Sequence, residues 1–348
     1  MLKRGIPFIE INAKDNYEFG YKLGKALKER IHERLRKSKE FFRKKTANGK
    51  NFELLEKKAK RFIPALEKYF PHLLIEAQAM AKGAEVPFEK LFALMCENEI
   101  VEYIMYPSHC TTVALRTKDN NILLGHNEDW FSEYRENGLY IAKAKIGKNK
   151  FLAVSYIGNL AGSAGGLNSN KLAFTDTSLF YNRFTYDIPR SFHLRALLEA
   201  KTPEQARKML NIEGSTGSNT LIVQSNSRIV DIEELWYCYK YFKSRNIFVH
   251  TNHPIQKKYQ TKSNTKFESL IRYKRAYEII KSEKEFTINT IKKILKDHKT
   301  NICGHLRKPA KIYSITRTIA SYIMNPKEQW LMLCHGNPCK GKYVKYCL

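Results

Sequence analysis

The stretch SHCTTVALRTKDNNILLGHNEDW, residues 108–130, contains two runs of strand-forming residues separated by a turn. The first run begins at Cys110, and the second follows the polar turn at 118–121. Alternating β-branched residues on both sides of an Asp-Asn-Asn turn predict a β-hairpin. Because the outer ends of a hairpin lie side by side, we expect Cys110 to face the segment 127–129, which carries amide and carboxylate groups.

Cys110 is a candidate nucleophile, although a mid-chain cysteine is more often a packed core thiol. A thiol nucleophile needs a base, and four histidines could supply one, as in papain-like enzymes. They are His109, His126, His250 and His253. Alternatively, cleavage of the peptide bond before Cys110 would free an α-amine with a pKa of about 7.7–8.0. The nucleophile and its base would then lie on the same residue, and the residues alone leave both routes open.

The composition indicates a globular protein of one large domain or two ordinary ones. The chain has 348 residues, of which 43% are hydrophobic and 12% aromatic. No apolar run approaches the roughly 18–20 residues that cross a bilayer. The first residues, MLKRGIPFIEIN, reach Glu10 before a long apolar segment forms, so we expect no signal peptide and no membrane span. We therefore expect the protein to remain in the cytoplasm.

The formal charge of +27 is concentrated in the last third of the chain. Such a charge favours nucleic acid or an anionic membrane as a partner. However, the lysines of segments such as 289–296 alternate with apolar residues at helical spacing, which predicts solvated helix faces. The sequence also lacks paired Cys/His fingers and an aromatic nucleic-acid motif. We expect no nucleic-acid partner and attribute the charge to compositional drift.

Seven cysteines, an odd number spread along the chain, favour reduced thiols over a disulfide framework. Cys334 and His335 precede Cys339, and Cys347 follows, which raises the question of a zinc site. These residues lack the paired Cys-x-x-Cys spacing typical of such sites, and a Gly-Asn-Pro turn accounts for the local sequence. The sequence therefore predicts no metal site.

The order of patterns along the chain predicts helices first and then strands. After a strand at 7–11, residues 15–106 have helical patterns, with Gly20 and Gly24 spaced for close packing. From Cys110 onward, strand groups alternate with helix groups, which suggests two sheets with helices on their outer faces. The glycine-rich passage 158–168 lacks the Gly-Lys-Ser/Thr ending of a phosphate loop, so we assign it no nucleotide role.

Cys110-Thr111-Thr112 followed by Gly125-His126-Asn127-Glu128-Asp129-Trp130 resembles a known family. This is the acyl-coenzyme A:6-aminopenicillanic acid acyltransferase (isopenicillin N acyltransferase-like) family of N-terminal-nucleophile cysteine hydrolases. Further similar passages occur in the family's order at 165–170, 250–253 and 336–339. The resemblance covers essentially the whole chain.

The resemblance implies an α+β fold, a four-layer αββα sandwich with a mainly helical N-terminal pro-segment. It implies autocatalytic cleavage between His109 and Cys110, after which residues 1–109 remain associated with 110–348. It also implies an amidohydrolase or acyltransferase that acts on a small amide or acyl-thioester substrate through an acyl-enzyme. No cofactor is implied, and acyl-coenzyme A enters only as a substrate. His109 departs from the glycine often found there, and a bulkier residue at the scissile bond would slow the acyl shift.

Roles for single residues follow from the same resemblance. Cys110 would be the nucleophile and, through its amine, the base. Asp129 would orient the new chain end or contact a substrate amine, and Asn219 would donate to the oxyanion. Arg317 and Asn127 would contact the substrate. Each residue also has a structural alternative. Asp129 would cap the end of the hairpin, Asn219 would hydrogen-bond the backbone of a turn, and Arg317 would be a surface cation. The alternative function is a non-catalytic, basic binding protein with Cys110 an inert thiol.

Overall fold

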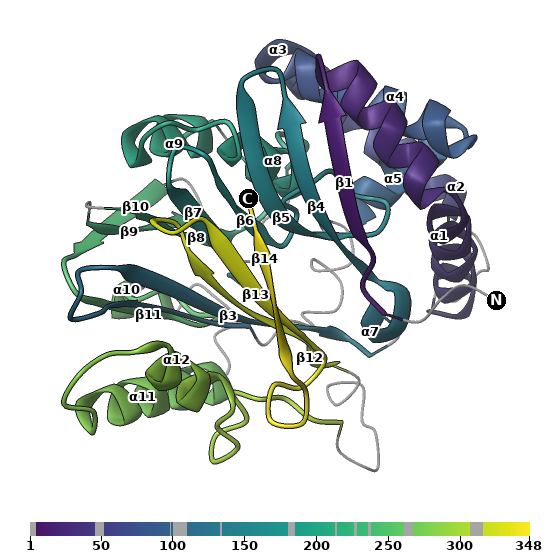
Figure 1. The fold of residues 1–348 in the computed structure, drawn as a ribbon. Helices are drawn as coiled ribbons and strands as arrows, with labels where there is room; N and C mark the ends of the chain where they lie inside the picture. Colours follow the sequence, from purple (N-terminus) through teal and green to yellow (C-terminus); the bar gives the residue numbers. More distant parts are fainter. Residues whose placement is uncertain are drawn as a thin grey trace.

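Two β-sheets face each other between outer layers of helices in a computed structural model of the chain (Figure 1). The structure describes residues 5–45, 52–97, 99, 110–132, 134–179, 185–212, 214–225, 228–235, 238–260, 267–306 and 316–348. This arrangement is a four-layer αββα sandwich, so the predicted layer architecture is confirmed.

The larger sheet has eight strands in the order β1-β4-β5-β6-β7-β8-β9-β10. Their bounds are β1 Phe8–Ala13, β4 Leu139–Ile146, β5 Asn149–Tyr156, β6 Gly165–Asn168, β7 Leu172–Ser178, β8 Ser218–Gln224, β9 Ile229–Leu235 and β10 Cys238–Ser244. β1 pairs parallel with β4, whereas the other neighbours pair antiparallel. The predicted pro-segment therefore contributes a strand to the sheet built mainly from residues after Cys110.

The smaller sheet has six antiparallel strands in the order β11-β2-β3-β12-β13-β14. Their bounds are β2 Thr111–Arg116, β3 Ile122–Phe131, β11 Ile247–His250, β12 Thr316–Asn325, β13 Trp330–His335 and β14 Tyr343–Cys347. β2 and β3 form the predicted hairpin, with Thr111 opposite Asn127. Between Thr318 and Ala320 the register of β12 against β3 shifts by a bulge.

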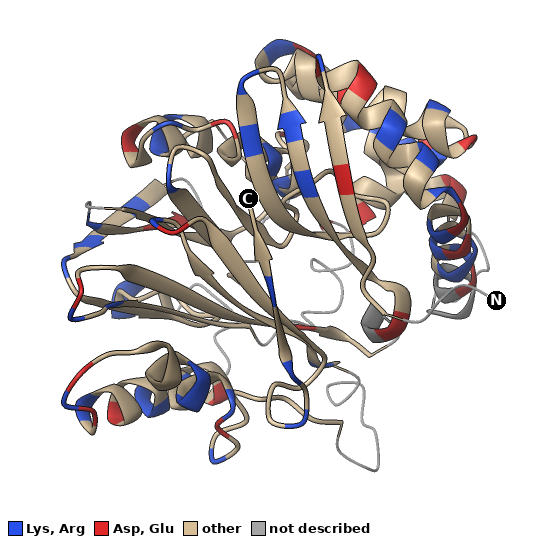
Figure 2. Cartoon of the chain, viewed as in Figure 1, with Lys and Arg blue, Asp and Glu red and all other residues tan. Residues whose placement is uncertain are grey.

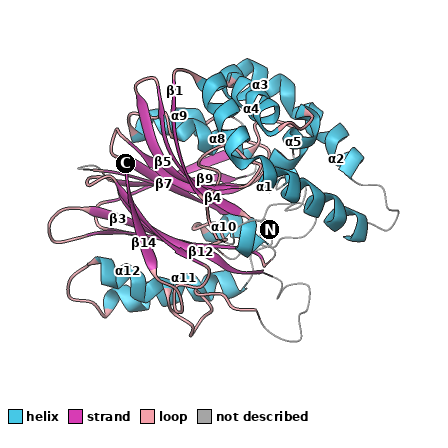
Figure 3. Ribbon diagram, turned by 45° about the vertical axis from the view of Figure 1, so that its right-hand side comes forward, coloured by secondary structure: helices cyan, strands magenta, loops and turns pink. Residues whose placement is uncertain are grey.

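Two groups of helices cover the outer faces of the sheets (Figures 1 and 3). The first group is α1 Asn16–Lys45, α2 Phe52–Ala59, η1 Lys60–Phe62, α3 Ile63–Tyr69, α4 Pro71–Ala84, α5 Phe88–Met95, α8 Arg190–Leu197 and α9 Pro203–Leu210. The second is α11 Phe267–Lys281 and α12 Ile288–Leu295, and the short helices α7 Tyr134–Asn137 and α10 Lys257–Gln260 lie in connections. Among the described helices, none has the length and hydropathy needed to cross a bilayer.

The structure departs from the predicted elements in one helical segment and in several strands. Within the predicted helical region 15–106, the segment 52–69 is divided into α2, η1 and α3, with Pro64 in the first turn of α3. Strands β6, β7, β10 and β11 were not predicted. β6 is Gly-Gly-Leu-Asn, and such a short glycine-rich run carries neither alternation nor β-branched residues, so only its pairing with β5 and β7 reveals it.

Strand β3 is buried on both faces, which places its side chains in two different environments. Leu124 and Trp130 belong to the core between the two sheets. Leu123 packs with the residues of α11 and α12, and a Cβ on Gly125 would lie 2.4 Å from Ile291. From Ile122 to Asp129, even-numbered residues of β3 therefore face the opposite sheet, and odd-numbered residues face the outer layer.

Glycines bring α1 and α4 into close backbone contact, as their spacing predicted. A Cβ at Gly20 would lie 2.1 Å from the Glu76 carbonyl oxygen, and one at Gly24 would lie 2.0 Å from the Met80 carbonyl oxygen. Only glycine leaves room for these backbone atoms.

Gly24→Ala is expected to lower the free energy of unfolding by about 1–3 kcal/mol, because the added methyl forces α1 away from α4. The gain in helix propensity, up to about 1 kcal/mol, works in the opposite direction and is included in that range. Urea unfolding followed by circular dichroism measures the change. Lys25→Ala, at an exposed position of the same helix, is the control; a stability of Gly24→Ala equal to or above that of the wild type would contradict the close contact.

Candidate active site

Cys110 lies immediately before β2 and is only 4% exposed. Its Sγ is 3.8 Å from the carbonyl oxygen of Asp129 and 3.9 Å from Oε1 of Glu128, both on the neighbouring strand β3. The expectation that Cys110 faces the 127–129 segment is therefore confirmed. The carboxylate nearest to the sulfur is that of Glu128, whereas the sequence analysis had selected Asp129.

Glu128 is the centre of a buried polar network. Tyr156 Oη donates to its Oε1 at 2.6 Å, and His126 Nε2 lies 3.2 Å from its Oε2. The other ring nitrogen of His126 lies 2.6 Å from Oγ1 of Thr112. Residues two apart on a strand share one face of the sheet. The spacing of His126 and Glu128 in the sequence therefore could have placed both on the side that faces the sulfur.

The surroundings of Cys110 keep its thiol protonated in the continuous chain. Burial raises the pKa of the Cys110 thiol well above its ordinary value of 9.0, and the nearby negative charge of Glu128 raises it further. A thiol is a poor nucleophile until it loses its proton. This thiol therefore needs a base close by.

Arg272, on α11, anchors the main chain at Cys110. Its guanidinium donates to the Cys110 carbonyl at 2.6 Å and to Thr111 Oγ1 at 2.9 Å, and its other nitrogen donates to Oδ1 of Asn252 at 2.8 Å. All of these side chains are buried. The sequence analysis missed Arg272 because more than 160 residues separate it from the cysteine, and it lies in a segment rich in exposed lysines.

Asp129 points to the outer face of the six-stranded sheet, toward Gly304 and Thr318. A Cβ on Gly304 would lie 3.2 Å from Oδ2 of Asp129. Burial raises the pKa of Asp129 to about 8, although the Thr318 hydroxyl and the charge of Arg272 act to lower it. The carboxyl group is therefore largely protonated at neutral pH. Its predicted contact with the new chain end or with a substrate amine stays a prediction.

Asn219 lies on β8 in the larger sheet, where its amide already has partners. Its Nδ2 donates to Oδ1 of Asp231 at 2.6 Å, and Thr177 Oγ1 lies 3.4 Å from its Oδ1. Burial raises the pKa of Asp231 to about 7, while the charge of the neighbouring His250 lowers it. The role of Asn219 as an oxyanion donor stays a prediction.

Two residues predicted to contact the substrate have partners within the protein, and their substrate contacts stay predictions. Asn127 faces the outer helices, and its Nδ2 donates to the carbonyls of Leu295 and Ile302, each at 2.9 Å. Arg317 donates from Nη2 to Oδ1 of Asn337 at 2.7 Å. The sequence patterns were correct about strand position but could not tell which face of the strand each side chain occupies. His109, the other residue of the predicted cleavage site, lies outside the described residues.

Three groups of described side chains converge closely enough to consider a metal ion. The groups are Cys110, His126 and Glu128; Asp231, Glu233 and His250; and His298, Cys303, His305 and Cys339. In each of the first two groups a histidine already pairs with a glutamate, His126 with Glu128 and His250 with Glu233. The third group has no carboxylate.

The sequence from 115 to 340 matches the family model described as acyl-coenzyme A:6-aminopenicillanic acid acyl-transferase. This match covers well over half of the chain. The chain belongs to this family. The matched region begins at Leu115, so Cys110 itself lies just before it, and the resemblance noted around Cys110 supplements the match.

Curated relatives of this family member include two enzymes. The chain is 26% identical to the β-alanyl-dopamine/carcinine hydrolase of Drosophila melanogaster over 44% of each chain. It is 24% identical to the 40 kDa form of the acyl-coenzyme A:6-aminopenicillanic-acid-acyltransferase of Emericella nidulans, over 68% of this chain and 66% of the relative. Both alignments thus span less than two thirds of the relatives' lengths.

Solved structures share the fold of this family member at low sequence identity. Penicillin V acylase from Agrobacterium tumefaciens is similar with a TM-score of 0.50 and 12% identity, over 69% of this chain and 86% of that one. A single-residue variant of conjugated bile acid hydrolase from Clostridium perfringens is similar with a TM-score of 0.50 and 14% identity, over 69% of this chain and 97% of that one. At these identities the similarity concerns the fold.

Proposed function

We propose that this chain is a self-processing N-terminal-cysteine amidohydrolase or acyltransferase. The observation that carries the proposal is the placement of Cys110 at the start of the central hairpin. Its buried thiol lies beside Glu128, and Arg272 donates a hydrogen bond to the main-chain carbonyl of Cys110. Membership in the acyltransferase family and the relatedness to an amide hydrolase support the same chemistry.

Self-processing would begin with attack of the Cys110 sulfur on the carbonyl carbon of His109. The C–N bond breaks, the nitrogen takes up the thiol proton and becomes the α-amine of Cys110, and the His109 acyl group is now a thioester on sulfur. Water then hydrolyses the thioester to a carboxylate at His109 and a free thiol. The hydrogen bond from Arg272 to the Cys110 carbonyl holds the main chain still during this exchange.

Turnover would use the same sulfur, now with the new amine as its base. The amine accepts the thiol proton while sulfur attacks the substrate carbonyl, and it passes that proton to the leaving amine. Water or a second amine then attacks the thioester and frees Cys110. We propose Asn219 as the oxyanion donor, which requires its amide to turn from Asp231 toward the substrate. Both reacting groups belong to the chain, so we propose no catalytic cofactor.

The two fragments are proposed to stay associated after cleavage. β1, from residues 1–109, pairs with β4 over six residues, from Phe8 opposite Ile141 to Ala13 opposite Ile146. Glu76 on α4 also forms a fully buried ion pair with Arg195 on α8. These contacts connect segments on the two sides of the proposed cut without covalent bonds.

The proposed substrate is a small amide or an acyl-thioester, with acyl-coenzyme A as a substrate in the transferase case. One curated relative is described as a hydrolase of β-alanyl-dopamine and carcinine, and the other as an acyl-coenzyme A-dependent transferase. We propose a cytoplasmic location, in keeping with the absence of disulfides among the described residues.

A basic binding protein remains the second candidate, and the positions of the charges do not favour it. Figure 2 places Asp and Glu among the Lys and Arg of α11 and of the connections next to α11 and α12. Two of the cations form ion pairs, Lys293 with Glu283 and Arg275 with Asp297. Such mixed, solvated faces differ from the single-sign surface that nucleic acid requires.

The test is intact-mass and N-terminal analysis of the purified wild-type protein, together with amide hydrolysis. We expect two fragments that elute together, the larger one beginning at Cys110, and hydrolysis of short acyl amides. An uncleaved chain without hydrolase or transferase activity, but with salt-dependent binding of DNA or RNA, would favour the binding protein.

Alkylation is expected to distinguish the two states of Cys110 within one partly processed sample. In the full-length chain the raised pKa keeps the thiol protonated, so iodoacetamide at pH 7.5 labels it much more slowly than the exposed Cys347. In the fragment starting at Cys110, the adjacent amine increases the labelling rate. Peptide mapping at timed intervals measures both rates; fast labelling of Cys110 in the full-length chain would contradict the assigned burial and pKa.

A further inference from the structure

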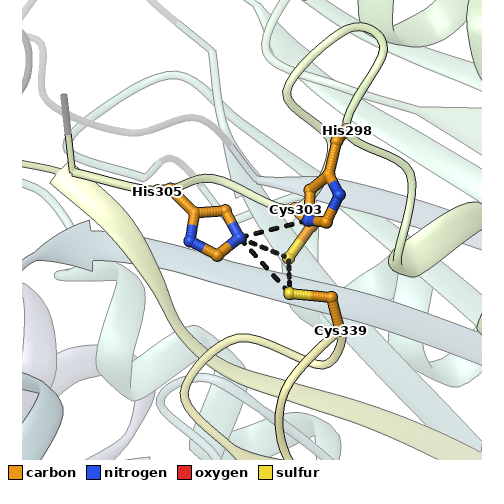
Figure 4. A group of neighbouring side chains, drawn as sticks. All are labelled: His298, Cys303, His305 and Cys339. Carbon is orange, nitrogen blue, oxygen red and sulfur yellow. Dashed lines mark hydrogen bonds between the residues drawn. The ribbon is translucent and has the colours of Figure 1, made fainter.

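His298, Cys303, His305 and Cys339 point toward one another at the outer edge of the six-stranded sheet (Figure 4). The first three lie in the connection that follows α12, and Cys339 lies in the turn between β13 and β14. Their nitrogen and sulfur atoms all lie within 4.8 Å of one another. Two separate loops therefore contribute side chains to a common centre.

The distances within this group match the edges of a zinc tetrahedron. With Zn–S near 2.3 Å and Zn–N near 2.0–2.1 Å, the edges are about 3.8 Å for S–S, about 3.5 Å for S–N and about 3.3 Å for N–N. The observed separations are 3.6 Å between the two sulfurs and 3.1 Å between the two Nε2 atoms. Nε2 of His305 lies 3.6 Å from Sγ of Cys303 and 3.3 Å from Sγ of Cys339.

The geometry points to a structural Zn²⁺ site formed by His298, Cys303, His305 and Cys339. Two thiolates and two imidazoles are a donor set that zinc prefers in four-coordinate structural sites. Because all four positions would be filled by the protein, no position remains for a catalytic water. The site is therefore separate from the chemistry at Cys110.

Neighbouring groups hold the ligands in place. Asn337 Nδ2 lies 3.5 Å from Sγ of Cys303 and donates to the Gly304 carbonyl at 2.6 Å. Arg317 in turn donates to Asn337 Oδ1 at 2.7 Å. Amide donors to a thiolate and a cation behind them are typical of the outer shell of a metal site. This network also accounts for Arg317, which sequence analysis had assigned to the substrate.

The zinc ion would hold the segment 302–304 in place against strand β3. Ile302 accepts from Asn127, and the Gly304 amide donates to Thr318 Oγ1 at 2.8 Å on the adjacent strand β12. Gly304 also packs against Asp129. These contacts are on the outer face of the strand whose inner face carries Glu128, so the ion would stabilise the strand that supports the active site.

In the structure, Cys339 meets other side chains than its neighbours in the sequence. Sequence analysis grouped Cys339 with Cys334 and His335, but Cys334 is buried beneath Gly341, and its sulfur lies near the carbonyls of His335 and Asn337. Cys303 and His305, which contact Cys339, come from 36 and 34 residues earlier in the chain. Only the fold brings them together.

The site is tested on untagged full-length protein produced with zinc and dialysed against a mild chelator. Elemental analysis is expected to find about one zinc per chain in the wild type and in Cys347→Ser, the control at an exposed cysteine. Cys339→Ser and His298→Gln should retain at least tenfold less zinc, since even outer-shell changes cost about 10–100-fold in affinity.

Measurements on the wild type keep the test decisive if the variants fail to fold. Cobalt substituted for zinc should give the absorption of a tetrahedral thiolate site, and removal of the ion should lower the melting temperature. A wild-type protein without zinc that gains no cobalt spectrum overturns the proposal, as does a Cys303–Cys339 disulfide in the purified protein. Neither outcome depends on cleavage at Cys110 or on amide hydrolysis, so this proposal and the proposed function can fail separately.

Discussion

Cys110→Ala is expected to leave the protein as a single chain of 40.6 kDa and to lower amide hydrolysis by about 10⁴-fold or more. The sulfur is the attacking atom in both self-cleavage and turnover, and no other thiol lies beside Glu128 and Arg272 among the described residues. Denaturing gels and intact mass follow cleavage, and release of amine from a short acyl amide follows turnover.

The matched control is Cys96→Ala, which removes a thiol that is equally buried and whose pKa is also raised by burial. This variant should split and turn over like the wild type. Cys110→Ser adds a second measurement, because the serine hydroxyl keeps the shape of the site. This variant should undergo self-cleavage slowly, if at all. A fully active Cys110→Ala protein would show that Cys110 is not the nucleophile. A wild-type protein that remained a single chain and was still active would contradict only the self-cleavage step.

Arg195→Met is expected to lower the free energy of unfolding by about 3–5 kcal/mol, the usual cost of leaving a buried charge without its partner. Arg195 and Glu76 are both fully buried, and two hydrogen bonds of 2.9 and 2.7 Å join them. Glu199 is a second carboxylate partner of the same guanidinium. Urea unfolding of the Cys110→Ala chain measures the loss without interference from cleavage.

In the processed protein the same substitution should release the small fragment, because Glu76 lies on α4 and Arg195 on α8, on opposite sides of the proposed cut. Size-exclusion chromatography in mild urea separates the fragments. The double variant Glu76→Gln/Arg195→Met should recover part of the stability, since the fully buried side chain at position 76 then carries no charge. The control is Lys293→Met, which breaks an exposed ion pair worth about 1 kcal/mol or less; an equally small effect at Arg195 would show that the buried pair does not hold the fragments.

The local patterns of the sequence determined most of the helical regions, the central hairpin and the position of the nucleophile. Alternation on either side of the 118–121 turn predicted the hairpin and the position of Cys110 opposite 127–129, and both are observed. Glycine spacing in α1 predicted its close contact with another helix. These features depend on neighbours along the chain, and the period of a strand or a helix encodes them directly.

Only the tertiary structure decided which side chains meet. The sequence placed Asn127, Glu128 and Asp129 together at one strand end, but pleating sends Glu128 to the sulfur and the other two to the outer face of the sheet. Arg272 reaches Cys110 from 162 residues away, and Cys339 reaches Cys303 from 36. Such contacts arise when whole sheets and helices pack to bury their apolar faces. These long-range contacts cannot be predicted from the hydrophobic periodicity of a segment, because the polar side chains that take part in them contribute nothing to that periodicity.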